Sequence, residues 1–190
     1  MIAILHEGNA QNTADNRLLK LLIENLNLDE KKVRFFGLGT KSNFFKKDIN
    51  AYKELITDIK EEIISKVLFV VDADYVKTDS KYGGFDNTLK EIIAIRKELD
   101  IYENSDLYIT CDFDTKEGYL ESFILSTIPP TQKECIETFL ECSDFKSKEN
   151  DKAILNQIYK NAYPNAPYDF SSEKFDTLKQ KLQTLFEGTN

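Results

Sequence analysis

The stretch VLFVVDAD, residues 67–74, is the most informative part of the chain. Five apolar residues run without a polar break from Val67 to Val71, and Asp72 and Asp74 follow with only Ala73 between them. A continuous apolar run of this length, rich in β-branched residues, is typical of a strand that is buried on both faces of a sheet. The stretch therefore predicts an internal strand that ends in two carboxylates.

The flanking segments alternate between strand and helix patterns. Further strands are predicted at IAILH (2–6), KKVRFFGLG (31–39) and DLYITCDF (106–113). Apolar residues recur at helical spacing in three segments between the strands. The first follows the cap candidates Asn12 and Thr13, the second is 49–65, with Ile63 on its apolar face, and the third is 85–101. Such alternation indicates βαβ units. We expect an α/β fold with a mainly parallel, Rossmann-like sheet of about four strands and helices on both faces.

The C-terminal third changes to helical patterns alone, in 119–128, 131–142, 152–163 and 171–186. With 190 residues and 41% hydrophobic content, the chain can bury one full core. We expect a single domain, with an α/β core over 1–115 and a helical extension over 116–190 packed on it.

Composition also limits the compartment. No apolar run approaches the roughly 20 residues of a membrane-spanning helix, so we expect no membrane partner and a cytoplasmic protein. Cys111, Cys135 and Cys142 are an odd number without CxxC spacing, which predicts free thiols.

The formal net charge of -8 disfavours a broad basic surface for nucleic acid. Nucleic acid or nucleotide therefore remain candidate partners only if they bind at a local site. The most basic loop, GTKSNFFKK (39–47), is predicted to hold Lys41, Lys46 and Lys47 in solvent around a packed pair of phenylalanines.

The spacing of Asp72 and Asp74 places both side chains on the same side of an extended strand. Two carboxylates about 5 Å apart repel by roughly 3 kcal/mol at an effective dielectric near 20. A shared proton, a nearby lysine or a hard cation with oxygen ligands would offset this repulsion. We favour a divalent cation held by Asp72 and Asp74.

Acids also follow the other predicted strands. In parallel α/β sheets, ligands bind outside the carboxyl ends of the strands. Glu7 ends the first strand in HEGN (6–9), where Gly8, followed by Asn9, permits a tight turn and the approach of an anion to the backbone. The last strand is followed by Asp112, Asp114 and then Glu121. Acids at strand ends also cap turns and helices, and His6, which alternation points away from Glu7, is expected to be structural.

IAILHEGN (2–9) and VLFVVDAD (67–74) resemble the two signatures of the Toprim (topoisomerase-primase) domain superfamily, in which a glutamate follows the first strand and a DxD follows a later one. The later segments 118–125, 152–170 and 175–186 are similar to a stand-alone bacterial Toprim-related family of uncharacterised function.

This resemblance implies a Mg²⁺ or Mn²⁺ ion held by Asp72 and Asp74, with Glu121 and then Asp114 as further acidic contributors. It implies that Glu7 binds the metal or acts as general acid or base on a phosphodiester of nucleic acid or nucleotide. The family pattern places an acid a few residues after its EG, whereas here the next acid is Asp15. The pattern also places a glycine closely after its DxD, whereas here glycine comes only at the end of the loop 75–84.

Two other functions fit some of the same residues. A Toprim-like module without catalysis would bind metal, nucleotide or a protein partner at the same edge. DADYV (72–76) also fits the DxDx[TV] element of haloacid-dehalogenase phosphatases, in which Asp72 is the nucleophile and Asp74 the acid. In those phosphatases the element normally lies on the first strand, whereas here another strand precedes it. Metal-dependent glycosyltransferases also use a DxD, but they are normally longer chains than this one.

Overall fold

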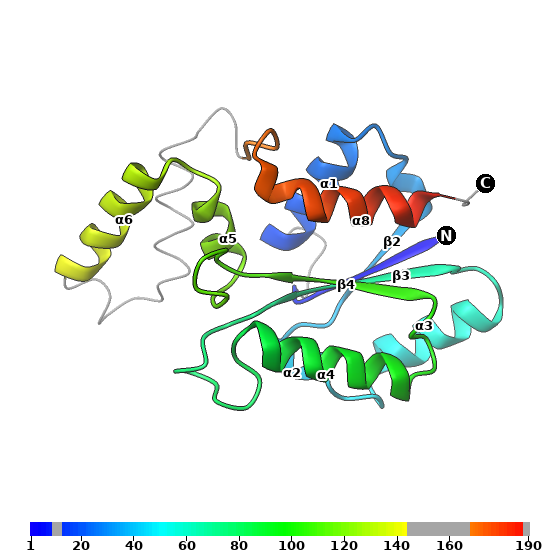
Figure 1. Cartoon of the computed structure of the whole chain (residues 1–190). Coiled ribbons are helices and arrows are strands. Elements are labelled where there is room, and N and C mark those ends of the chain that lie inside the picture. The colour runs from blue at the N-terminus through cyan, green and yellow to red at the C-terminus, as the bar shows by residue number, and fades with distance from the viewer. Residues whose placement is uncertain (9–12, 144–167, 188–190) are drawn as a thin grey trace.

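The computed structural model describes residues 1–8, 13–143 and 168–187. It has an α/β fold built on one four-stranded sheet in which every pair of neighbouring strands is parallel (Figure 1). The strands lie in the order β2-β1-β3-β4 and are β1 (Ile2–His6), β2 (Val33–Gly37), β3 (Lys66–Asp72) and β4 (Ser105–Thr110). The predicted fold class is therefore confirmed.

The two inner strands explain the unbroken apolar runs. Every residue of β1 is buried, and so is every residue of β3 after Lys66, because helices cover both faces of the sheet. The strands are aligned so that Leu5 is paired with Phe69 and Asp72 with Thr110. This register brings the carboxyl ends of β1, β3 and β4 to one edge.

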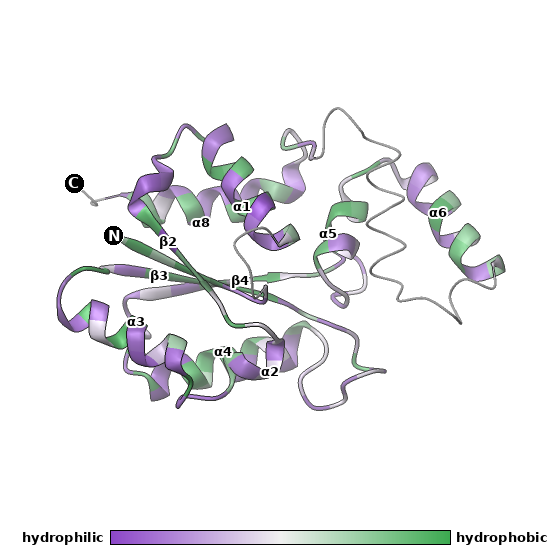
Figure 2. Ribbon diagram, turned by 180° about the vertical axis from the view of Figure 1, so that it is seen from behind, coloured by the Kyte–Doolittle hydropathy of each residue, from purple (hydrophilic) through white to green (hydrophobic). Residues whose placement is uncertain are grey.

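Helices cover both faces of the sheet, as Figures 1 and 2 show from opposite sides. Apolar side chains pack between the helices and each face. One face packs against α1 (Ala14–Asn25), α5 (Leu120–Ser126) and α8 (Asp176–Phe186). The opposite face packs against α2 (Lys41–Phe44), α3 (Asn50–Lys60) and α4 (Phe85–Glu98). Short 3-10 turns, η1 (Glu30–Lys32) and η3 (Glu173–Phe175), precede β2 and α8.

The helical tail contributes to the first of these cores. Leu178, Leu182 and Leu185 recur along α8 and are buried in the same cluster as Ile2 and Leu68 of the sheet. Helix α6 (Pro130–Cys142) lies at the end of the molecule, beyond α5, and buries Leu140 in that cluster (Figure 1). The predicted helix 152–163 lies outside the described residues.

Helix boundaries follow local signals. Thr13 caps α1, because its side-chain oxygen accepts a hydrogen bond from the backbone N–H of Asn16 at 3.5 Å.

The expectation that Ile63 lies on a buried helix face is wrong, because α3 ends at Lys60 and Glu62 has a left-handed backbone with φ of 59°. The chain has left the helix there, and Ile63 is 41% exposed.

Two predictions from composition agree with the structure as far as it is described. The helices over 13–143 and 168–187 include none with the length and apolarity that a membrane crossing requires. All three cysteines are free thiols, with Cys111 buried and Cys135 and Cys142 exposed.

Candidate functional site

Asp72 occupies the centre of the carboxyl edge of the sheet, between β1 and β4. It is only 2% exposed. Its Oδ1 accepts a hydrogen bond from the hydroxyl of Thr110 and another, at 2.9 Å, from the backbone N–H of Leu120, the first residue of α5. The carboxylate thus joins β3 to β4 and to the start of α5.

Glu7, directly after β1, lies against the same point. Its Oε1 accepts the backbone N–H of Asp72 at 2.9 Å. These two acids are 65 residues apart in the sequence, and the parallel pairing of β1 with β3 brings them together. The structure thus brings Glu7 into contact with Asp72 through the backbone N–H of Asp72.

Asp74 lies outside the strand. β3 ends at Asp72, and Asp74 has a left-handed backbone with φ of 56°, a conformation that aspartate adopts more readily than most residues. Its backbone N–H donates to the Gly118 carbonyl at 2.6 Å, and the Gly118 N–H donates back at 3.0 Å. The strand alternation used to place Asp72 and Asp74 on one side therefore does not reach Asp74.

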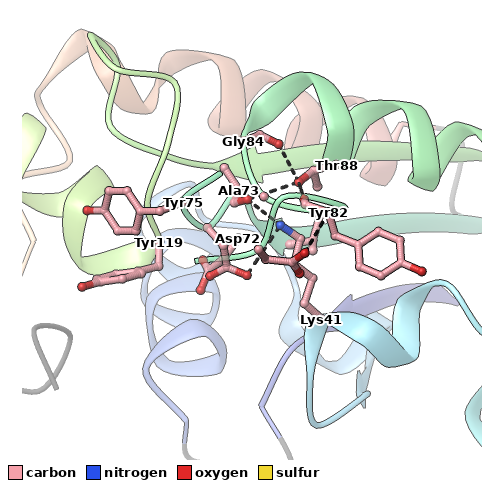
Figure 3. Close-up of polar contacts among 12 residues, drawn as sticks. Lys41, Asp72, Ala73, Tyr75, Tyr82, Gly84, Thr88 and Tyr119 are labelled. Atoms are coloured by element: carbon pink, nitrogen blue, oxygen red, sulfur yellow. Dashed lines mark hydrogen bonds and ion pairs between the residues drawn. The ribbon is translucent and has the colours of Figure 1, made fainter. Parts of the chain in front are cut away.

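The carbonyl of Ala73, between the two aspartates, is the acceptor that fixes this turn (Figure 3). It accepts hydrogen bonds from the Lys41 ammonium, from the Gly84 N–H at 2.9 Å and from the Thr88 hydroxyl at 3.3 Å. Gly84 has φ of 85°, which favours glycine, and it precedes α4. The loop 75–84 thus returns its final glycine to the DxD, next to it in space although ten residues later in sequence.

Lys41 is the cation of this group, and its burial was not predicted. Its side chain is 7% exposed, and its Nζ lies 3.5 Å from Oδ2 of Asp74. Burial lowers the pKa of Lys41, and the negative charges of Asp74, Glu7 and Asp72 raise it, without fully cancelling the effect of burial. All three acids therefore lie close enough to act on one ammonium.

The expectation that Lys41 is solvated is wrong because α2, which starts at Lys41, packs Phe44 into the core at 0% exposure. The short helix thereby places the Lys41 side chain against the turn formed by residues 72–74. Phe45 is partly buried and stacks on Tyr82 of the loop, with ring centroids 4.5 Å apart. The predicted packing of the phenylalanine pair is confirmed.

A cavity of about 260 Å³ adjoins the site between α5 and α6. Its wall includes Tyr75 and Tyr119, whose rings meet edge to face at 5.6 Å and which Figure 3 shows on one side of Asp72. The Tyr75 hydroxyl is 3.2 Å from Oγ of Ser122. Asp112 and Lys133 form an ion pair in the same wall.

That ion pair forms a second charged group, apart from the acids at β1 and β3. Burial would raise the pKa of Asp112, but hydrogen bonds from Lys133 and from the backbone N–H groups of Thr115 and Asp114 lower it overall. Asp114 itself is 79% exposed and lies 3.6 Å from the Lys133 ammonium. Asp114 is therefore directed to Lys133, and the expectation that it contributes to a metal site with Asp72 is not supported.

Glu121 is 5% exposed in the first turn of α5, one residue after the N–H that binds Asp72. Burial is the main cause that raises the pKa of the Tyr168 hydroxyl, Arg17 lowers it, and the charges of Asp15 and Glu121 raise it further. Glu121 and Asp15 thus share a neighbour on the α1 side of the sheet. Asp15, whose role the sequence left open, thus lies near the Tyr168 hydroxyl.

Two residues beside Glu7 have structural explanations. A Cβ at Gly8 would lie 2.2 Å from the Thr13 side chain, so close packing against the α1 cap accounts for this glycine. His6 is 2% exposed, its ring meets Phe35 edge to face, and burial lowers its pKa to about 4. Asn9, also predicted near the substrate, lies outside the described residues.

The donor set fits Mg²⁺ only in a limited form. Among residues 1–8, 13–143 and 168–187, no three His, Cys, Asp or Glu side chains are grouped closely enough to hold one ion. The predicted four-acid set of Asp72, Asp74, Glu121 and Asp114 is thus not assembled. Mg²⁺ is commonly bound by only one or two carboxylates, with waters and substrate phosphates as its other ligands. Glu7, whose carboxylate contacts the backbone of Asp72, and Asp72 itself would supply the one or two carboxylates of that simpler arrangement.

Sequence reasoning missed two members of the site. Thr110 lies beside Asp72 only because β4 is the neighbour of β3, so its role becomes visible once strand order is known. For Lys41 the available signal was position, since it lies four residues after Gly37, the carboxyl end of β2.

In comparisons with known proteins, no protein-family model, curated protein or solved structure matches this chain.

Proposed function

We propose that this protein is a Mg²⁺-dependent, nuclease-like enzyme of the Toprim type that acts on a phosphodiester of nucleic acid or nucleotide. The observation that supports it most is the hydrogen bond from the Asp72 N–H to the Glu7 carboxylate, 2.9 Å long. It places two acids from the ends of adjacent parallel strands at the edge where α/β sheets bind ligands.

In this proposal each residue has a defined task. Asp72 has its Oδ1 held by Thr110 and by the start of α5, so its other oxygen, Oδ2, would be the oriented ligand of the ion. Glu7, which is partly exposed, either binds the ion or moves a proton at the phosphodiester. When bound, Mg²⁺ supplies positive charge that stabilises the phosphate oxygens as negative charge develops on them.

The test is an assay of purified protein with Mg²⁺ or Mn²⁺ against DNA, RNA and nucleotides. We expect Glu7→Gln and Asp72→Asn to lower the rate by at least about a hundredfold, which is the lower range for loss of a general base or an electrostatic contact. Glu98→Gln is the matched control, because Glu98 is half exposed and pairs with Lys47 on the surface. Rates in the two site variants equal to that of the control would refute the proposal.

A binding module without catalysis is the second candidate, and the Lys41–Asp74 contact favours it. An ammonium 3.5 Å from one of the predicted metal ligands already compensates part of the acidic charge. Under this alternative, Mn²⁺ or a nucleotide raises the melting temperature in an Asp72-dependent way while no phosphoester is turned over. Turnover that is lost in Asp72→Asn would exclude it.

The phosphatase alternative is the least supported by the geometry. A nucleophilic carboxylate must present an oxygen along an open line of attack. Asp72 is 2% exposed, and its Oδ1 is engaged by Thr110 and Leu120. Trapping of an aspartyl-phosphate on Asp72 would nevertheless reverse this ranking.

A further inference from the structure

Lys41 is a buried charge at the edge of the sheet. Its Nζ donates to the Ala73 carbonyl and lies 3.5 Å from the Asp74 carboxylate. Removing an ammonium from water costs several kcal/mol unless specific partners offset the loss. A lysine that is 7% exposed is therefore held there by these partners.

The neighbouring lysines of the same segment behave differently. Lys46 is exposed and hydrogen-bonds to Asn43, and Lys47 is 53% exposed and pairs with Glu98. These two can be changed without altering a buried group. Lys41 alone in this segment reaches the turn between Asp72 and Asp74.

Lys41 and a metal ion would use the same chemistry at this turn. A carboxylate next to an ammonium already has part of its charge neutralised, and a second cation close by is repelled by the first. The charges that act on Lys41 come from Asp74, from Glu7 and from Asp72. Glu7 and Asp72 are the two acids of the proposed ion site, and Asp74 is the predicted ligand whose charge Lys41 already compensates in part.

We propose that Lys41 is the resident counter-ion of the site and competes with a divalent cation for the carboxylate of Asp74. This inference rests on the proposed metal-dependent function and adds a positioning residue to it. Lys41 holds the Ala73–Asp74 turn in place when no metal is bound, and it weakens metal binding because Asp74 is shared.

The competition is tested by measuring the dissociation constant of Mn²⁺ by calorimetry. We expect Lys41→Met to bind Mn²⁺ at least about tenfold more tightly than the unaltered protein, as loss of a like charge predicts. Lys41→Arg keeps the charge and Lys47→Met alters an exposed ion pair, so both should match the unaltered protein. The gain should vanish when Lys41→Met is combined with Asp74→Asn.

A second measurement uses the unaltered chain and so does not depend on a variant that folds. Protein with ¹⁵N-labelled lysine is titrated with Mg²⁺, and the Lys41 ammonium resonance should shift while that of Lys47 stays in place.

The outcomes separate the two proposals. Tighter binding in Lys41→Met supports the competition even where the unaltered protein binds no Mn²⁺, in which case only the metal-dependent function fails. Equal or weaker binding in Lys41→Met, or a Lys41 resonance that stays in place while Mg²⁺ binds, overturns the competition and leaves the function standing. No binding by either protein overturns both.

Discussion

Replacing Asp72 by alanine or by asparagine separates the structural role of this side chain from its charge. Both variants remove the negative charge, so any relief of repulsion from Glu7 or Asp74 is common to them. Asparagine keeps an oxygen that accepts hydrogen bonds from Thr110 and Leu120, and alanine keeps none. The difference between the two variants therefore measures the cost of leaving the Leu120 N–H without an acceptor and the Thr110 hydroxyl with only the Val71 carbonyl, 3.3 Å away.

The size of the difference follows from burial. Thr110 is 2% exposed and Leu120 is 1% exposed, so water does not readily replace the lost acceptor. A buried donor without a partner costs about 1 to 3 kcal/mol. One unpaired donor and one weakened hydrogen bond make Asp72→Ala less stable than Asp72→Asn by about 2 to 4 kcal/mol, or roughly 4 to 16 °C in melting temperature for a chain of this size.

Urea unfolding followed by circular dichroism, with a thermal scan of the same samples, measures this difference. The slope of unfolding free energy against urea should be the same in both variants, since the fold buries the same surface. Equal stability of Asp72→Ala and Asp72→Asn would refute the assignment of Asp72 as the acceptor that joins β3, β4 and α5.

Three further perturbations test neighbouring features. Thr88→Val removes a buried hydroxyl that lies within hydrogen-bond distance of three carbonyl groups, those of Gly84, Tyr82 and Ala73, and should cost about 1 to 2 kcal/mol in urea unfolding. No loss would contradict the view that this hydroxyl holds the loop 75–84 against the turn. Gly84→Ala forces a Cβ to 2.8 Å from Val76 at a φ of 85° and should lower the melting temperature by several degrees. Because the pKa of His6 is lowered from 6.5 to about 4, the unfolded chain binds the extra proton between these pH values. Stability should thus fall as pH drops through that window, by at most about 3 kcal/mol, and His6→Gln should lack this component.

The sheet was predictable because its information is local and repeated. The apolar runs at 2–5 and 67–71 mark strands buried on both faces, and helical spacing between strands requires parallel crossovers. Ile63 marks the limit of this reasoning. Its spacing fits the preceding helix, but the left-handed backbone at Glu62 ends that helix first.

The candidate site was predictable only where it depends on strand ends. Glu7 and Asp72 follow directly from the rule that parallel strands share a carboxyl edge. Asp74 and Asp114 lie beyond the strands, where loop geometry, and not alternation, decides their direction. Lys41 depends on how a four-residue helix packs, which no periodicity in so short a segment can indicate.

The central claim is that acids from separate strands form a cation site at the carboxyl edge of the sheet. Crystals soaked in Mn²⁺ and measured at a wavelength that gives anomalous scattering test it directly. We predict an anomalous peak about 2.0 to 2.3 Å from a carboxylate oxygen of Asp72 or Glu7, the range for Mg²⁺-like ions. A peak only at surface acids elsewhere, or no peak with Lys41 still against Asp74, would contradict the claim.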